Sequence, residues 1–139
     1  RKSLYHFKNP KKCVIIRRHQ RISRASIEIK MDVWIDRPEL AQLIAARVAE
    51  RPVVVLTGIR QVGKSALLRH LFPTHRYLTL DLPSLAEAAE RDPEQLLREH
   101  PTPLLIDEVQ YAPALFRHLK RSVDADRTPG RFVLSGSQK

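Results

Sequence analysis

The stretch from Val53 to Ser65 reads VVVLTGIRQVGKS. Its first part, within Pro52–Thr57, is apolar and rich in β-branched residues, which is typical of a parallel strand buried on both faces. A loop bounded by glycines follows, and Leu67, Leu68 and Leu71 then recur at helical spacing. The stretch therefore predicts a strand, a loop and a helix in immediate succession.

Strands and helices alternate outward from this stretch. Three further apolar runs predict strands, and four more segments show helical spacing or helix-start signals. We expect these strands at 77–81, 103–107 and 131–135, and these helices at about 37–50, from 84, at 93–100 and at 113–123. Strands separated by helices imply right-handed crossovers, so the sequence predicts an α/β fold with a mainly parallel sheet.

Three polar signals predict where helices begin. Asp36 followed by Glu39, and Ser84 followed by Glu87, have the spacing of a capping residue and its partner in the first turn. Asp92 stands directly before a proline and an acid, which is typical of a helix N-terminus. We therefore expect caps at all three positions.

The loop matches G-x-x-x-x-G-K-[ST] at every fixed position. Such a loop turns backbone N–H groups toward an anion, and the helix after it adds its positive end. Lys64 would reach the β- and γ-phosphates of a nucleotide, and the Ser65 hydroxyl would bind Mg²⁺. The expected nucleotide-binding residues of the loop are Gly58, Ile59, Arg60, Gln61, Val62, Gly63, Lys64 and Ser65.

A second acidic motif ends the third strand. Ligands of a parallel sheet bind beyond the carboxyl ends of its strands, so Asp107 should lie beside the phosphate loop. We expect Asp107 to hold Mg²⁺ together with Ser65, usually through water, and Glu108 to act as the catalytic group beside Lys64 by orienting the attacking water. Ser135 ends the fourth strand, where it either contacts the γ-phosphate or belongs to a turn.

The positive charge is concentrated at the N-terminus. Residues 1–30 hold ten Lys and Arg and one acid, whereas residues 31–139 hold 15 Lys and Arg and 14 acids. The net charges are therefore 10 − 1 = +9 and 15 − 14 = +1. We interpret residues 1–30 as a disordered arm or as translated upstream sequence before a start at Met31, and residues 31–139 as the N-terminal part of a nucleotide-binding domain.

The rest of the composition narrows the class of protein. The apolar runs are too short for a membrane span, and no stretch has the order of a signal peptide. The single cysteine, Cys13, excludes an internal disulfide framework, and the six histidines lack metal-ligand spacing. A reducing, cytoplasmic setting fits these features best.

Together the motifs resemble those of prokaryotic AAA-type P-loop ATPases, in the group whose AAA domain precedes a C-terminal domain of unknown function. The resemblance covers about residues 33–138, and the stretches that carry it are Leu56–Ser65, Leu80–Leu85, Ile106–Pro113 and Gly130–Gln138. It implies a P-loop three-layer sandwich in which the fourth strand lies between the first and third. It also implies a sensor-like end at Ser135–Ser137 and a chain that stops before a fifth strand, a lid and the C-terminal domain.

The resemblance and the motifs predict an ATP hydrolase that uses Mg²⁺ and drives a conformational change. Its expected partners are ATP and the missing C-terminal domain, and a homo-oligomer is left open. Two alternatives remain: a nucleic-acid-binding protein that uses the basic arm, and a nucleotide-sensing switch with little turnover. A GTPase is disfavoured because no Asn-Lys-x-Asp motif occurs, and a small-molecule kinase is disfavoured by the acid pair.

Overall fold

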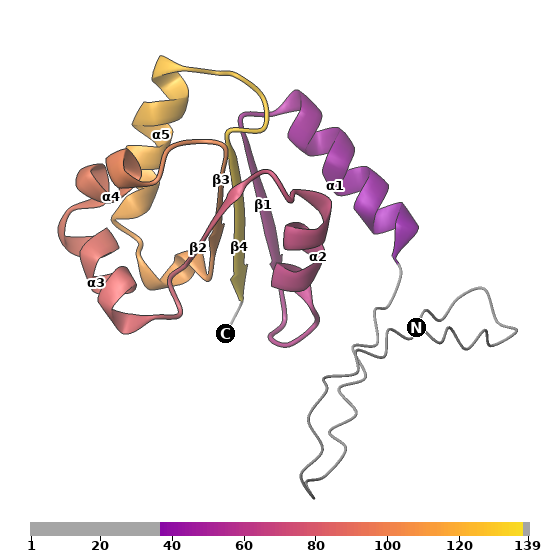
Figure 1. Cartoon of the computed structure of the whole chain (residues 1–139), viewed down its shortest axis with the longest axis horizontal. Coiled ribbons are helices and arrows are strands. Elements are labelled where there is room, and N and C mark those ends of the chain that lie inside the picture. The colour runs from indigo at the N-terminus through magenta and orange to yellow at the C-terminus, as the bar shows by residue number, and fades with distance from the viewer. Residues whose placement is uncertain (1–36, 138–139) are drawn as a thin grey trace, which may run out of the picture. The chain divides into compact units, whose positions relative to one another are not determined.

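The computed structural model describes residues 37–137 (Figure 1). The predicted basic tail and the predicted cap at Asp36 lie outside these residues. Five α-helices, one 3₁₀ helix and four strands follow one another within this range. They are α1 (Pro38–Glu50), β1 (Val53–Gly58), α2 (Lys64–Leu71), β2 (Arg76–Thr79), α3 (Pro83–Arg91), α4 (Pro93–Glu99), β3 (Leu104–Asp107), η1 (Val109–Tyr111), α5 (Leu115–Ala125) and β4 (Phe132–Ser137). The predicted α/β class is confirmed.

The four strands form one all-parallel sheet in the order β1-β4-β3-β2. The fourth strand therefore lies between the first and the third, as the resemblance implied. In the register of β4, Ser135 lies opposite Leu56 and Ser137 lies opposite Gly58, the first residue of the loop. This order brings the end of β4 between the predicted phosphate loop and the acidic end of β3.

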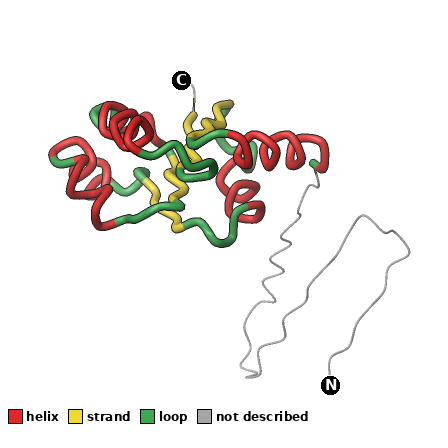
Figure 2. Tube along the Cα trace, turned by 90° about the horizontal axis from the view of Figure 1, so that it is seen from above, coloured by secondary structure: helices red, strands yellow, loops and turns green. Residues whose placement is uncertain are grey.

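Helices cover both faces of the sheet. In Figures 1 and 2, α1 and α2 lie on one side of the strands, and α3, α4 and α5 lie on the other. Alternate residues of each strand supply the two apolar cores, because successive side chains point to opposite faces. Leu105 and Val133 pack with α1 and α2, whereas Ile106 and Leu134 pack with α3, α4 and α5. The arrangement is the predicted three-layer sandwich.

Strand β1 departs from the sequence prediction. It lies at an edge of the sheet within the described residues, and the side chain of Val55 is 48% exposed. Val54 and Leu56 are half-buried against the α1 and α2 core. The apolar composition of β1 therefore indicated the strand correctly but overstated its burial, since one face of an edge strand is only partly covered.

The predicted helix starts have mixed outcomes. The Asp92 side chain accepts a hydrogen bond from the backbone N–H of Gln95 at 2.9 Å, so this cap is confirmed. The cap predicted at Ser84 is wrong, because α3 begins at Pro83 with Leu82 in the capping position and Ser84 inside its first turn. The longest described helix, α1, has 13 residues, and no helix among residues 37–137 is long and apolar enough to cross a membrane.

Candidate functional site

Polar side chains gather on one face of the sheet, at the carboxyl ends of the strands. By strand alternation Asp107 shares a face with Leu105, and Ser135 and Ser137 share it with Val133, which is the face that α2 covers. All three polar side chains are buried. The sheet therefore presents a carboxylate and two hydroxyls toward the start of α2, where the predicted phosphate loop ends.

The loop between β1 and α2 has the backbone of an anion-binding turn. Gln61 and Gly63 have positive φ angles of 60° and 83°, and α2 begins directly after them at Lys64. A Cβ on Gly63 would meet no atom within 4 Å, so the glycine is required by its left-handed backbone rather than by lack of space. Such loops present successive N–H groups at a helix N-terminus to bound anions.

Lys64 is a buried cation held by neutral groups. Its Nζ atom donates to the carbonyl oxygens of Gly58 at 3.1 Å and Ile59 at 2.7 Å, and to the Ser137 hydroxyl at 3.3 Å. The residue is 9% exposed, and none of the ion pairs within residues 37–137 involves it. Because buried charges in proteins are normally paired, this ammonium group is suited to an incoming anion.

Asp107 is held as an ionised carboxylate. Its Oδ1 accepts hydrogen bonds from the Ser135 hydroxyl and, at 3.1 Å, from the Glu108 amide, and its Oδ2 accepts one from the Tyr77 hydroxyl at 2.8 Å. Burial raises the pKa of Asp107, but hydrogen bonds from Ser135, Ser65, Tyr77 and the Glu108 amide together lower it below its ordinary value. The carboxylate therefore stays charged at neutral pH.

Tyr77 contributes to this arrangement from β2. Burial raises the pKa of Tyr77, and the hydrogen bond to Asp107 and the charge of that carboxylate raise it further, so the phenol remains a donor. The guanidinium carbon of Arg69, on α2, lies 4.7 Å from the centre of the Tyr77 ring, within cation–π range. The ring is thus located between α2 and the end of β3.

Glu108 follows Asp107 in a left-handed backbone conformation, with a φ of 55° and a ψ of 42°. Its Oε1 accepts a hydrogen bond from the Ser137 hydroxyl at 3.1 Å, and its Oε2 accepts one from the Gln110 side-chain amide. The Ser137 hydroxyl also accepts a hydrogen bond from Lys64 Nζ. A continuous chain of hydrogen bonds therefore joins Lys64, through Ser137, to Glu108.

The remaining predicted residues lie around the loop. Arg60 donates to the Tyr111 hydroxyl at 2.7 Å and so connects the loop to η1. Ile59 is 71% exposed, and Val62 and Ser65 are half-buried. The structure therefore brings Lys64, Ser65, Asp107, Glu108 and Ser135 together, whereas the Ile59 side chain points into solvent.

Two contributors, Tyr77 and Gln110, were not among the predicted site residues, whereas Ser137 lies in the sensor-like end that the resemblance implied. Tyr77 stood inside an ordinary strand pattern, and Gln110 followed the acid pair without a motif of its own. For Tyr77, the alternation of side chains along a strand was the one usable signal. Tyr77 lies opposite Leu105 in the register and therefore shares its face of the sheet. That signal becomes useful only when the order of the strands is known.

The oxygen atoms of this site fit Mg²⁺ better than a transition metal. Among residues 37–137 there is no group of three or more His, Cys, Asp or Glu side chains that could hold a metal ion. The expected ligands Ser65 and Asp107 supply only oxygen, and the Ser65 hydroxyl is among the groups that lower the pKa of Asp107. Mg²⁺ is commonly held by one or two such protein groups together with water and phosphate, so the donor set is consistent with it.

An all-parallel sheet with a glycine-lysine-serine loop after its first strand defines a P-loop nucleotide-binding domain. The sequence profile of the AAA domain matches residues 50–139, so this chain belongs to the AAA domain family. The match begins at the last residue of α1 and includes the loop, the acid pair and β4. The AAA-type P-loop fold that the motifs resembled is thereby confirmed.

Two curated relatives are similar to the chain over 104 residues, with 35% identity: the uncharacterized proteins Mb2031c of Mycobacterium bovis and Rv2008c of Mycobacterium tuberculosis. The similarity covers 74% of this chain but only 24% of each relative, so the chain spans about a quarter of their length. No solved structure matches the chain.

Proposed function

We propose that this domain binds ATP together with Mg²⁺, and that the protein hydrolyses ATP to ADP and phosphate to drive a conformational change. The observation that carries the proposal is Lys64, a buried ammonium group with only carbonyl and hydroxyl partners at the start of α2. A triphosphate would supply the missing negative charge, and the loop and helix N-terminus would supply further N–H donors.

Each polar group then has a role in phosphoryl transfer. Lys64 would neutralise the β- and γ-phosphates, and Ser65 and Asp107 would hold Mg²⁺, which offsets the charge that develops on the phosphate oxygens. Glu108 would orient a water molecule and take its proton. The water oxygen forms a bond to the γ-phosphorus as the bond to the β–γ bridging oxygen breaks, which releases ADP and phosphate.

The proposed binding is tested by calorimetric titration of ATP with Mg²⁺ into the wild type and Lys64→Ala. Lys120→Ala is a matched control, because it removes the same charge from an exposed site on α5. We expect saturable binding in the wild type and the control and its loss in Lys64→Ala, with all three proteins giving cooperative melts. Equal affinity in Lys64→Ala would contradict the proposed site.

Turnover is tested separately from binding. Glu108→Gln keeps the shape of the side chain but removes its basicity, so we expect ATP affinity close to that of the wild type and phosphate release reduced by a factor of about 100. If this variant hydrolysed ATP at the wild-type rate, the role proposed for Glu108 would be wrong even if ATP binding were established.

A further inference from the structure

Gln110 connects the acid pair to the end of β4 through both ends of its carboxamide. Its Nε2 donates to Glu108 Oε2, and its Oε1 accepts a hydrogen bond from the backbone N–H of Ser137 at 3.2 Å. The residue is half-buried in η1, just after the acid pair. One side chain thus fixes the distance between the carboxylate of Glu108 and the backbone of β4.

Gly136 lies against the same carboxamide oxygen. A Cβ added to Gly136 would lie 2.9 Å from Gln110 Oε1, closer than such atoms approach in proteins. The φ angle of Gly136 is not in the left-handed range, so the backbone itself does not require glycine there. Strand β4 lacks a side chain at the position where Gln110 packs against it.

The two carboxylate oxygens of Glu108 have different partners. Gln110 holds Oε2, whereas Oε1 lies toward Ser137, whose hydroxyl is also bonded to Lys64. The oxygen that Gln110 does not hold therefore lies on the side of the loop lysine, where the Ser137 hydroxyl donates to it. Displacement of Gln110 would remove one of the two hydrogen bonds that orient the Glu108 carboxylate and would leave only the bond from Ser137.

We propose that Gln110 is a positioning residue that orients Glu108 toward the γ-phosphate side of the site, and that Gly136 is glycine to admit it. The inference rests on the proposed function, in which Glu108 orients the attacking water. Gln110 touches neither nucleotide nor water in this scheme and acts only through Glu108. It should therefore affect the arrangement that precedes bond formation and leave the binding of ATP itself nearly unchanged.

The test compares affinity for ATP with affinity for ADP plus aluminium fluoride, a mimic of the phosphoryl group under attack, both with Mg²⁺. We expect Gln110→Ala to keep ATP affinity within about twofold and to weaken the binding of the mimic about tenfold or more. Gly136→Ala should reproduce this loss by displacing the carboxamide. The double variant should show no larger loss than either single variant, because both remove one contact.

Gln95→Ala is the matched control. Gln95 donates to Glu99 on α4 at 2.8 Å, so its removal also breaks a glutamine–glutamate bond, but one on the exposed surface of α4. This variant should bind ATP and the mimic like the wild type. Thermal melts check that every variant is folded. If Gly136→Ala does not fold, the result for Gln110→Ala alone decides the test.

The outcomes separate this inference from the proposed function. A wild type that binds ATP and gains affinity from aluminium fluoride, with the same gain in Gln110→Ala, overturns the positioning role and leaves the function standing. Additive losses in the double variant also overturn it, since they would show that Gly136 acts without Gln110. A wild type that binds no nucleotide, or gains nothing from aluminium fluoride, contradicts the proposed function and this inference together.

Discussion

Asp107 receives hydrogen bonds from both neighbouring strands as well as from its own chain. Ser135 donates from β4 and Tyr77 from β2, while the next backbone amide donates to the same oxygen as Ser135. The carboxylate is therefore fixed in orientation before any ligand arrives. Hydrogen bonds to a metal-binding carboxylate commonly affect metal affinity, because they determine where its free lone pairs point.

Tyr77→Phe removes one of the hydroxyl groups that donate to Asp107 and so tests whether these donors affect metal affinity. We expect about tenfold weaker binding of Mn²⁺, a spectroscopic substitute for Mg²⁺, to the protein saturated with ATP, because Asp107 loses one of its orienting donors. Binding of ATP without metal should change little. Electron paramagnetic resonance measures the bound and free metal directly.

Tyr111→Phe is the control for Tyr77→Phe. The two tyrosines are similarly exposed, at 36% and 39%, but the Tyr111 hydroxyl accepts a bond from Arg60 rather than donating to an acid. We expect its affinity for Mn²⁺ to match the wild type. Equal metal affinity in Tyr77→Phe and the wild type would show that the phenol does not orient Asp107.

The lowered pKa of Asp107 also predicts how stability depends on pH. Its folded pKa lies below the ordinary value of 3.8, so the ionised carboxylate stabilises the fold above that value. This contribution is lost as the pH falls through the folded pKa. Asp107→Asn should therefore be clearly less stable than the wild type in urea at about pH 7, and the difference should shrink toward about pH 3. A difference that stayed constant with pH would contradict the assignment.

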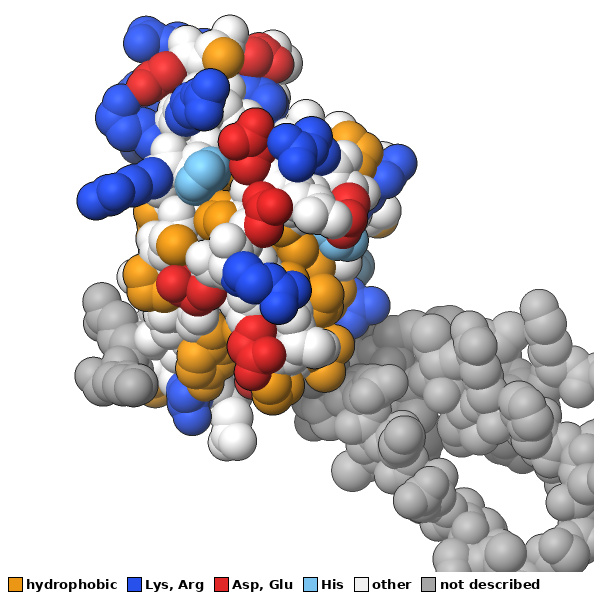
Figure 3. Space-filling model, turned by 90° about the vertical axis from the view of Figure 1, so that its left-hand side faces the viewer, with side chains coloured by type: hydrophobic (Ala, Val, Ile, Leu, Met, Phe, Trp, Pro, Cys, Tyr) orange, Lys and Arg blue, Asp and Glu red, His pale blue; other side chains and the backbone are white. Residues whose placement is uncertain are grey.

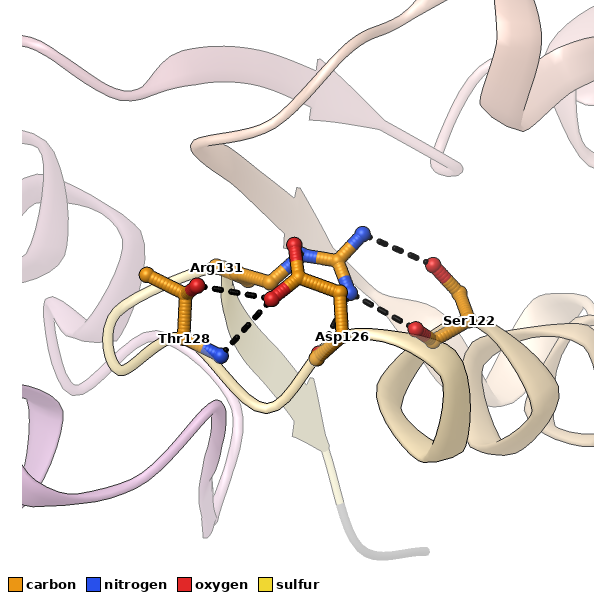
Figure 4. Close-up of polar contacts among 4 residues, drawn as sticks. All are labelled: Ser122, Asp126, Thr128 and Arg131. Carbon is orange, nitrogen blue, oxygen red and sulfur yellow. Dashed lines mark hydrogen bonds and ion pairs between the residues drawn. The ribbon is translucent and has the colours of Figure 1, made fainter.

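At the scale of elements, Arg131 joins the start of β4 to the end of α5. Its guanidinium donates to the Ser122 carbonyl at 2.7 Å, the Asp126 carbonyl at 2.6 Å and the Ser122 hydroxyl at 3.0 Å (Figure 4). The backbone N–H and the hydroxyl of Thr128 both donate to the Asp126 side chain. Arg131 Nε lies 3.3 Å from Asp126 Oδ2, an ion-pair distance without hydrogen-bond geometry. One planar group thus satisfies carbonyls at the end of a helix.

Arg131→Lys should destabilise the protein by about 1–2 kcal/mol. Lysine keeps the charge but cannot reproduce the planar set of N–H donors with which the guanidinium reaches three oxygen atoms. Urea unfolding at neutral pH measures the change. Arg117→Lys, at an exposed position of α5, is the control and should be neutral. Equal stability of Arg131→Lys and the wild type would show that the charge alone is sufficient to join α5 and β4.

The elements themselves could largely be predicted from the sequence. Runs of four to six mainly apolar residues separated by helical spacing indicated every strand, although only the central strands β3 and β4 are buried along their whole length. Boundaries were harder: β4 extends to Ser137, where polar residues obscured the strand, and η1 gave no periodic signal. The mistaken cap at Ser84 shows that a capping pattern competes with a proline one residue earlier.

At the scale of the whole molecule, the site joins residues far apart in the chain. The positions of the loop and the acid pair were predictable because each is a short, contiguous motif at the end of a strand. Tyr77 and Gln110 were not, because their contacts depend on the order β1-β4-β3-β2 and on the close approach of η1 to Gly136. Residues that position others leave little trace in local sequence, since their partners lie on other elements.

The distribution of charge over the whole chain leads to a different prediction. The excess of +9 belongs to residues 1–30, whereas residues 31–139 have 15 Lys and Arg against 14 acids. On the side of the molecule that carries α3 and α4, acidic and basic side chains are interspersed rather than separated by sign (Figure 3). Affinity for nucleic acid depends on the number of phosphates that cations neutralise, so any such affinity should come from the N-terminal segment.

We therefore expect removal of residues 1–30 to abolish binding of a short DNA duplex while leaving ATP affinity unchanged. In the intact chain, DNA binding should weaken steeply with salt, because each phosphate contact releases a counterion. Fluorescence anisotropy at several salt concentrations measures this slope, and calorimetry measures ATP binding to the same two proteins. DNA binding that survived the deletion would place the contact on the domain instead. Loss of ATP binding on deletion would show that the segment belongs to the nucleotide-binding unit, contrary to the boundary that the charge distribution predicts.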